Sequence, residues 1–349
     1  MRQLIVPLPP HVQSEAGQQE KNPRAIFVLA PPRSGTTLLR VMLAGHPQLF
    51  AAAELQLLGF NTLTERRAAF SGKYSLWLEG TIRAVMQIQG CDADQAKSIL
   101  ERCENQGMTT RQFYHLLQDW IAPQTLVDKS PSYALDLKTL KRAEDEFESA
   151  LYIHLVRHPY AMVRSFEHYR MEQVFFMPKH PFSARELGEL VWVVSHQNIV
   201  EFLSSVPEER QYRMRFEDLT HRPQAVMEEM CRQLDLEYHP DLIDPYKNKE
   251  KKMTDGIYAA SAPMGDRKFN EYQGIDPKIA ESWKAVMRDN FLGEPTWEWA
   301  ERLGYERIGH QAALGGWKLK SHESMEQLTA GKDRLKQLYQ RRQRTRENG

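Results

Sequence analysis

Residues 25–37 read Ala-Ile-Phe-Val-Leu-Ala-Pro-Pro-Arg-Ser-Gly-Thr-Thr. The apolar run Ile26–Ala30 predicts a short buried strand, and the turn after it leads into a helix expected over residues 38–44. A strand, loop and helix of this kind binds phosphate at the helix N-terminus. A P-loop kinase or ATPase has a lysine in this loop, whereas this chain has Arg33 followed by Ser-Gly-Thr-Thr. The loop is therefore predicted to bind an anion, but not the triphosphate of ATP with its magnesium.

Further strands and helices alternate along the chain, and polar residues follow each strand. Strands are expected over Thr125–Val127, Leu151–Val156 and Tyr212–Phe216; helices are expected over residues 75–121 and 184–203, and from Pro159 and Pro223 onward. This alternation predicts an α/β fold, a parallel sheet with helices on both faces. Ligands of such sheets bind beyond the carboxyl ends of the strands, which is where the polar residues lie.

The composition excludes several classes of protein. Lys+Arg and Asp+Glu are equal at 46 each in 349 residues, which argues against a general nucleic-acid binder. No apolar stretch approaches the roughly 18 residues that a membrane span needs. The three cysteines (Cys91, Cys103 and Cys231) have no metal-binding spacing, and a reducing compartment suits them. We therefore expect a cytoplasmic protein without a membrane span.

The sequence predicts three regions of different character. Residues 1–23 are polar and rich in Pro and Gln, and are expected to form a flexible leader. Residues 24–310 are expected to form the catalytic domain, and residues 311–349 a helical or linker tail. Residues 247–275 lack a clear period and are expected to form a mobile loop that closes over a site.

Two separated motifs resemble those of one enzyme family. The first is Pro32–Leu38, and the second is Tyr152–Arg157 with Ser165 eight residues after Arg157. Together they resemble the 5′-phosphosulfate loop and the 3′-phosphate site of sulfotransferases that use 3′-phosphoadenosine 5′-phosphosulfate (PAPS). The strand end Arg213–Leu219 is also similar to that family.

A closer likeness is to the sulfotransferase domains of modular polyketide synthases and olefin-forming synthases. The segments that carry it are Pro47–Leu58, Asp128–Tyr133 and Met253–Phe269. The resemblance implies a P-loop-containing nucleotide-hydrolase-like sulfotransferase fold. It also implies PAPS as co-substrate, adenosine 3′,5′-bisphosphate (PAP) as product, and no metal.

The resemblance assigns the donor site residue by residue. Arg33, with the backbone and hydroxyl groups of Ser34, Gly35, Thr36 and Thr37, would bind the 5′-phosphosulfate, and Arg33 would also act in catalysis. A glycine in this loop lets the backbone approach the anion closely. Arg157 and Ser165 would bind the 3′-phosphate, for which the planar guanidinium is well suited.

Two further residues are expected to perform the chemistry. Lys129 matches the lysine that contacts the bridging oxygen or the sulfonate in this family. Small-molecule sulfotransferases have a catalytic histidine two residues after that lysine, but this chain has Pro131 there. Glu54, 21 residues after Arg33, has the spacing of the glutamate base of tyrosylprotein sulfotransferases. We therefore predict that Glu54 is the general base.

Other polar residues are given lesser roles. His158 is expected to pack or to cap a turn, and His196 to be structural or to line the acceptor site. Arg170 is a candidate for lining the acceptor mouth or for reaching a phosphate. Arg267 and Lys268 would reach the 3′-phosphate as an Arg-Lys-Gly loop does in other branches, although Phe269 replaces the glycine.

The predicted function is transfer of a sulfonate from PAPS to a hydroxyl. By resemblance, the acceptor is a β-hydroxyacyl chain on an acyl carrier protein, with neighbouring synthase domains as partners. Three alternatives stay open: a free small-molecule or protein-tyrosine acceptor, a nucleotide-binding scaffold that has lost catalysis, and a P-loop kinase.

Overall fold

Five short strands form one parallel sheet in the larger of two compact units. The computed structural model describes residues 20–176, 182–248, 252, 269–288 and 291–307. Among these residues, those up to 157 and those between 195 and 280 form the larger unit, and those between 158 and 194 and between 281 and 307 form the smaller one.

The sheet has the order β2-β3-β1-β4-β5, with every neighbouring pair parallel. This confirms the predicted fold class. The strands are β1 (Ile26–Leu29), β2 (Leu49–Ala51), β3 (Thr125–Asp128), β4 (Leu151–Val156) and β5 (Gln211–Arg215). Four of them were predicted to within one residue at each end. The three-residue edge strand β2 was not.

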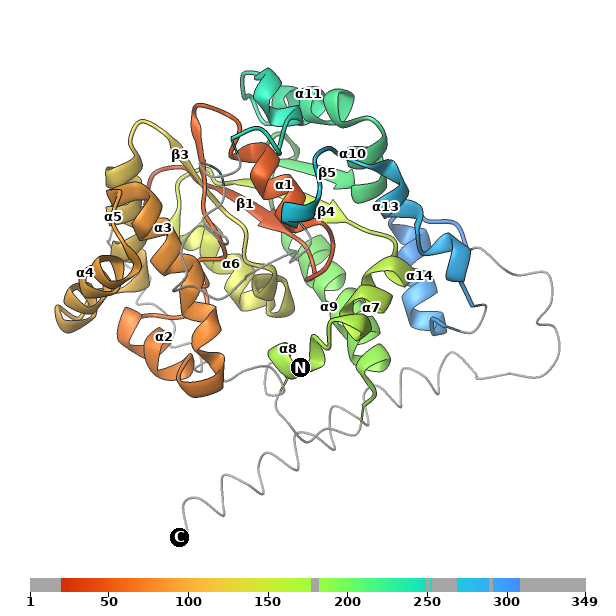
Figure 1. The fold of residues 1–349 in the computed structure, drawn as a ribbon, viewed down its shortest axis with the longest axis horizontal. Coiled ribbons are helices and arrows are strands. Elements are labelled where there is room, and N and C mark those ends of the chain that lie inside the picture. Colours follow the sequence, from red (N-terminus) through yellow and green to blue (C-terminus); the bar gives the residue numbers. More distant parts are fainter. Residues whose placement is uncertain (1–19, 177–181, 249–251, 253–268, 289–290, 308–349) are drawn as a thin grey trace, which may run out of the picture. The chain divides into compact units, whose positions relative to one another are not determined.

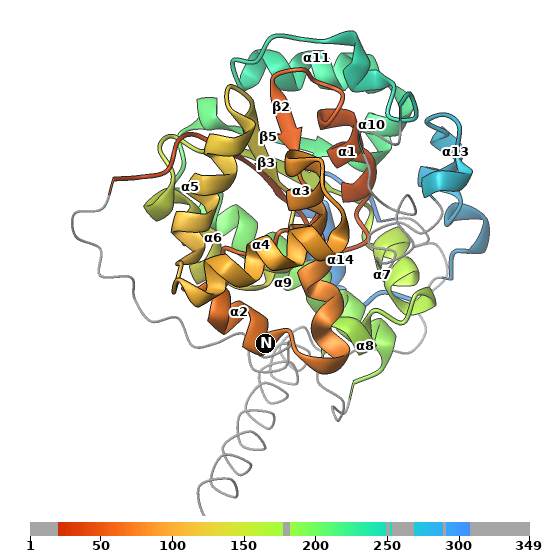
Figure 2. The ribbon, with the colours of Figure 1, turned by 60° about the vertical axis from the view of Figure 1, so that its left-hand side comes forward.

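Helices cover both faces of this sheet (Figures 1 and 2). Side chains alternate along β1, so that Ile26 and Val28 join one core and Phe27 and Leu29 join the other. The first core includes α1 (Thr36–Leu43), α10 (Phe216–His221) and α11 (Pro223–Gln233). The second includes α2 (Leu63–Ala69), α3 (Glu79–Gln89), α4 (Ala93–Asn105), α5 (Thr110–Ile121), α6 (Leu137–Glu146) and the end of α9 (Ala184–Leu203).

The predicted helical stretch over 75–121 consists of α3, α4 and α5, preceded by the 3₁₀ segment η1 (Gly72–Leu78). Gly90 and Gly107 interrupt it with φ values of +60° and +69°, a conformation that glycine adopts without steric cost. Helix α1 begins at Thr36, two residues before the predicted start. Asn22, near the end of the predicted leader, is buried and pairs with the backbone of Glu146 and Glu148.

The smaller unit contains α7 (Pro159–His168), α8 (Glu172–Phe175), the first part of α9 and α14 (Glu294–Arg302). Its His158 accepts a hydrogen bond from the backbone N–H of Tyr160 at 3.2 Å and stacks on Trp283, with ring centroids 3.9 Å apart. His158 therefore caps α7 and packs against an aromatic ring, as predicted.

The remaining short elements lie late in the chain or between strands. They are η2 (Pro131–Leu135), η3 (Glu208–Arg210), η4 (Pro240–Ile243), η5 (Phe269–Glu271), α13 (Pro277–Glu281) and η6 (Lys284–Val286). The predicted tail at 311–349 lies outside the described residues, as does most of the predicted mobile loop. Within the described residues, no helix combines the length and the apolar character that crossing a membrane requires.

Candidate active site

The carboxyl ends of four of the five strands carry the residues singled out in the sequence, in the order of the strands themselves. Glu54 follows β2, Lys129 follows β3, the anion loop follows β1, and Arg157 follows β4. Because β1 pairs with β3 on one side and β4 on the other, the loop lies between Lys129 and Arg157. This is the sheet edge at which ligands of parallel α/β folds bind.

The anion loop has the backbone that phosphate binding requires. Gly35 has φ +88°, and a Cβ atom there would lie 2.1 Å from the ring of Phe216, so no larger residue fits without displacement. Thr36 and Thr37 open α1, whose first N–H groups have no partner within the helix. The Ser34 hydroxyl is fully buried and has no hydrogen-bond partner among the described residues. A buried hydroxyl without a partner is rare in folded proteins and suits a ligand oxygen.

Arg157 is held against this loop. Its Nη1 donates to the carbonyl oxygen of Arg33 at 2.8 Å, and its guanidinium lies 4.7 Å from the centroid of the Phe216 ring. Arg33 itself has φ +64°, which is uncommon for a residue with a side chain. The contact thus stabilises the loop conformation. Ser165 lies half-buried on α7 in the smaller unit, so its predicted pairing with Arg157 stays a prediction.

Glu54 and Lys129 form an ion pair. The Lys129 ammonium donates to Glu54 Oε1 at 2.6 Å, and the Lys129 residue is only 2% exposed. Burial lowers the pKa of Lys129, and the negative charge of Glu54 opposes that shift. Glu54 lies in a partly buried segment that is neither helix nor strand. The structure therefore brings together the two residues predicted for the chemistry, 75 positions apart in sequence.

Arg40 adds a second buried cation near this pair. It donates from Nη1 to the carbonyl oxygens of Ala51 at 3.2 Å and Lys252 at 3.0 Å. Burial lowers its pKa to about 10, opposed by the charge of Glu54, so Arg40 is cationic at neutral pH. The sequence analysis did not identify Arg40, although a single charged residue in the otherwise apolar run from Leu38 to Leu43 is a signal for it.

A buried hydrogen-bond network fixes the backbone on either side of Lys129. Asp128 accepts hydrogen bonds from Tyr114 Oη at 2.6 Å, Tyr133 Oη at 2.9 Å and Ser130 Oγ at 2.8 Å. Tyr133 Oη also accepts from the N–H of Leu57 at 2.8 Å. Burial raises the pKa of Asp128, and these donors oppose the rise. The network ties the segment after β3 to the segment after β2, and hence Lys129 to Glu54.

The histidine considered for the acceptor site has a buried partner. His196 Nδ1 lies 2.9 Å from His154 Nε2, so that one ring donates to the other. Burial lowers the pKa of His154 to about 3 and that of His196 well below its usual value, and the charge of Arg213 adds to both shifts. Both rings are therefore neutral near pH 7 and only weakly basic, which favours the structural role over proton transfer.

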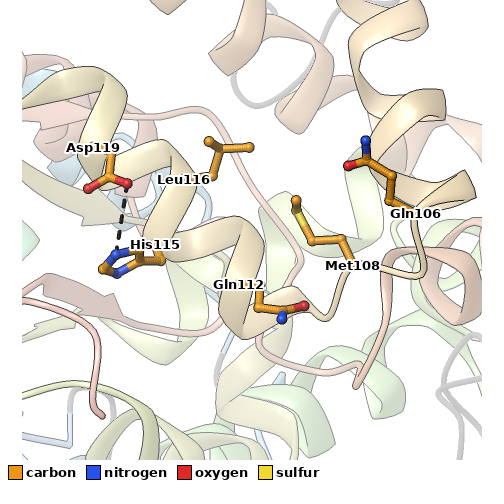
Figure 3. Close-up of a pocket in the computed structure, with 6 residues that line it drawn as sticks. All are labelled: Gln106, Met108, Gln112, His115, Leu116 and Asp119. Carbon is orange, nitrogen blue, oxygen red and sulfur yellow. Dashed lines mark ion pairs between the residues drawn. The ribbon is translucent and has the colours of Figure 1, made fainter. Parts of the chain in front are cut away.

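A pocket on the larger unit lies between α4 and α5, and none of its residues was predicted for the site (Figure 3). His115 and Asp119 line it, with 3.8 Å between Nε2 and Oδ2, and both side chains are exposed. Among the described residues, no group of three or more His, Cys, Asp or Glu could hold a metal ion. Arg267 and Lys268 lie outside the described residues, whereas Phe269 is buried and stacks on Tyr246.

Comparisons with known proteins identify the family of this chain. Residues 23–240 match the sequence profile described as "Sulfotransferase family". The sulfotransferase domain from the curacin biosynthetic pathway is 39% identical, with a TM-score of 0.75 over 82% of this chain and 99% of that domain. The sulfotransferase domain of the Synechococcus PCC 7002 olefin synthase is 33% identical, with a TM-score of 0.73 over 83% of this chain and 98% of that domain.

Two longer proteins are also similar in sequence. The nodulation protein NoeE of Sinorhizobium fredii is 24% identical over 76% of this chain, and an uncharacterized Aquifex aeolicus protein is 26% identical over 78%. The chain spans 61% of the length of the first and 34% of the second. With a profile match that includes all five strands and a 39% identical domain matched over almost its whole length, the chain belongs to the sulfotransferase family.

Proposed function

We propose that this sulfotransferase moves the sulfonate of PAPS to the hydroxyl of a β-hydroxyacyl chain carried by an acyl carrier protein. The observation that carries the proposed chemistry is the 2.6 Å contact between Glu54 and Lys129, beside the anion loop. It puts a carboxylate that can accept a proton next to an ammonium that can stabilise a leaving oxygen. Sulfonyl transfer to a hydroxyl requires both groups.

The anion loop and Arg157 are suited to the two charged ends of the donor. Ser34 Oγ and the N–H groups at the start of α1 would receive the 5′-phosphosulfate, together with Arg33, Thr36 and Thr37. The other guanidinium nitrogens of Arg157, with Ser165, would receive the 3′-phosphate. The buried Ser34 hydroxyl supports a ligand at this place.

In the proposed reaction, the acceptor oxygen forms a bond to sulfur while the bond from sulfur to the bridging phosphate oxygen breaks. Glu54 takes the proton of the attacking hydroxyl, and Lys129 donates a hydrogen bond to the oxygen that gains negative charge. Arg33 stabilises the same charge from the loop. PAP then leaves with the electron pair of the broken bond. The protein contributes alignment and fixed charge, as in phosphoryl transfer.

The two similar synthase-derived domains support the acceptor class. One is a sulfotransferase domain from a biosynthetic pathway and the other a sulfotransferase domain from an olefin synthase, and this chain covers nearly all of each. We infer that a carrier-protein-bound hydroxyacyl group and neighbouring synthase domains are its partners. The three free thiols are compatible with a reducing, cytoplasmic location for the proposed reaction.

Binding of the donor is tested first. Thermal unfolding is measured with PAP and with adenosine 5′-monophosphate, which lacks the 3′-phosphate. At about 100 times its Kd, a ligand stabilises a protein by about 2.7 kcal/mol. We expect that stabilisation with PAP and none with the monophosphate at the same concentration. Equal responses to the two nucleotides would contradict a 3′-phosphate site at Arg157 and Ser165.

Transfer is then assayed with ³⁵S-labelled PAPS and three acceptors: a 3-hydroxyacyl carrier protein, the corresponding free 3-hydroxy acid, and a tyrosine peptide. We expect labelling of the carrier protein. Labelling of the free acid or the peptide alone would reject the proposed acceptor, but it would still support sulfonate transfer from PAPS to a hydroxyl. PAP binding without any transfer would indicate a scaffold, and magnesium-dependent ATP turnover would indicate a kinase.

A further inference from the structure

The segment Glu54–Leu58 follows β2 and has no regular secondary structure, although most of it is buried. Its backbone is bound on one side by residues that follow β3. The N–H of Gln56 donates to Ser130 Oγ at 3.1 Å, and the N–H of Leu57 donates to Tyr133 Oη at 2.8 Å. These contacts bind two N–H groups of the segment, and other partners bind its carbonyl groups.

Two side chains from α2 and α3 bind those carbonyl groups. Arg66 on α2 donates from Nη2 to the carbonyl oxygen of Leu55 at 2.9 Å and from Nε to that of Gln56 at 3.0 Å. Thr81 on α3 donates to the same Leu55 oxygen at 2.9 Å and accepts from Arg66 Nη2 at 2.6 Å. Both residues are buried, and we refer to Arg66 and Thr81 as the carbonyl clamp.

The carbonyl clamp acts at a place where the backbone is strained. Gln56 has φ +53°, a left-handed conformation that is uncommon for a residue with a Cβ atom. Such a residue persists only where its surroundings hold it, and the N–H and the carbonyl of Gln56 are both bound by buried side chains. The start of α3 also lies against the segment, because a Cβ atom at Gly80 would lie 1.9 Å from the carbonyl oxygen of Glu54.

We propose that Arg66 and Thr81 are positioning residues for Glu54. This inference rests on the proposed function, in which Glu54 is the general base. The clamp binds the carbonyl groups of the two residues that follow Glu54. It thereby fixes the backbone from which the Glu54 side chain extends toward Lys129. Neither clamp residue contacts the reacting atoms. Alignment matters greatly here, because a misplacement of about 1 Å can lower a rate by about 100-fold.

Thr81 and Thr110 offer a matched comparison. Both are fully buried threonines, and each donates a hydrogen bond to a backbone carbonyl: Thr81 to Leu55 at 2.9 Å and Thr110 to Phe60 at 2.6 Å. Replacement by valine removes the hydroxyl and conserves the shape in both cases. Phe60 is six residues from Glu54, so only Thr81→Val disturbs the clamp.

The rates are measured with PAPS and the acceptor that the unsubstituted protein labels. For Thr81→Val we expect kcat to fall about 10-fold with the KM for PAPS unchanged, since only proton removal is impaired. For Thr110→Val we expect kcat within about twofold of the unsubstituted protein. In a Glu54→Gln background, Thr81→Val should lower the rate no further, because the base that it positions is absent.

Two outcomes would overturn the inference: equal losses of kcat in the two valine variants, or an undiminished effect of Thr81→Val in the Glu54→Gln background. Hydrogen exchange at the amides of Gln56 and Leu57 tests the clamp without any turnover. We expect faster exchange in Thr81→Val than in Thr110→Val, and equal exchange would refute the clamp. A complete lack of transfer by the unsubstituted protein would instead refute the proposed function, so the two failures are distinguishable.

Discussion

Replacing Glu54 by glutamine tests the chemical core of the proposed site. The substitution keeps the size of the side chain but removes its charge and its ability to accept a proton at neutral pH. In the structure Glu54 is the ion-pair partner of Lys129, which is almost completely buried. The substitution therefore has separate consequences for the rate, for stability and for donor binding.

The size of each consequence follows from the contact that is lost. Loss of a general base lowers kcat by about 10²–10⁴-fold. Removing one partner of a buried ion pair costs about 3–5 kcal/mol of unfolding free energy. We expect about 3 kcal/mol, the lower end of that range, because the glutamine oxygen can still accept from Lys129. A neutral amide competes for Lys129 less strongly than a carboxylate does, so the donor sulfonate can bind Lys129 more readily. PAPS should therefore bind more tightly to the variant, whereas PAP, which has no sulfonate, should bind as before.

The assay combines initial rates of ³⁵S transfer with calorimetric titration of PAP and of PAPS into the slow variant. Glu79→Gln is the matched control, because Glu79 is a partly buried carboxylate at the start of α3 that interacts with the charges of Arg83 and Lys97. Its kcat should stay within a few-fold of the unsubstituted value. A Glu54→Gln variant that retains full kcat would refute the base assignment. Equal weakening of PAP and PAPS binding would refute the proposed competition between Glu54 and the donor sulfonate for Lys129.

Three further predictions concern the loop, the arginine beside it and the buried histidines. Gly35→Ala should lower the free energy of unfolding by about 1–2 kcal/mol through the left-handed backbone alone. It should also abolish PAP binding, because the new methyl group clashes with the Phe216 ring. An unchanged PAP affinity in calorimetry would reject this prediction. Arg157→Lys should weaken PAP binding by about 1.5–3 kcal/mol. The ammonium of lysine cannot replace the planar guanidinium, which binds the Arg33 carbonyl oxygen and would also bind the 3′-phosphate. An equal loss of affinity for adenosine 5′-monophosphate would show that the lost contact is not to the 3′-phosphate. Burial keeps His154 and His196 neutral in the folded protein, whereas both bind protons in the unfolded chain below about pH 6.5. The free energy of unfolding should therefore decrease by about 1 kcal/mol per histidine as the pH is lowered from 6.5 to 5.5. Denaturant titrations of a His154→Gln variant should show a shallower fall, and an unchanged slope would contradict the assignment.

Local patterns in the sequence were sufficient to predict most of the fold. The apolar runs of β1, β3 and β4 and the alternating sequence of β5 are each followed by turn or charged residues, and α9 was predicted with its observed bounds. The same local signals placed Lys129 and Arg157 at strand ends. Because parallel strands end at one edge of the sheet, the sequence predicted that these residues share a side of the molecule.

The residues that the sequence did not reveal depend on contacts between distant segments. Arg66 lies in a polar helix whose bounds were not predicted, and its partners at residues 55, 56, 77 and 81 give no local pattern. Arg40 lies on the buried face of α1, where a charge is compatible only with carbonyl partners that the fold brings from Ala51 and Lys252. No spacing rule within one helix identifies such partners.

The edge strand β2 explains why Glu54 needs so many contacts. It has only three residues, and its register pairs Ala51 with Val127, so that Glu54 and Lys129 emerge from adjacent strands three and two residues beyond that pair. The adjacent strands bring the two residues near each other. A three-residue strand at a sheet edge, however, does little to fix the conformation of the segment that follows it. Beyond Ala52, whose N–H still donates to Val127, side chains take over the pairing: Ser130 and Tyr133 bind the N–H groups, and Arg66 and Thr81 bind the carbonyls. These four side chains replace the strand pairing along the irregular segment, and they would give the proposed base, Glu54, the fixed position that proton transfer requires.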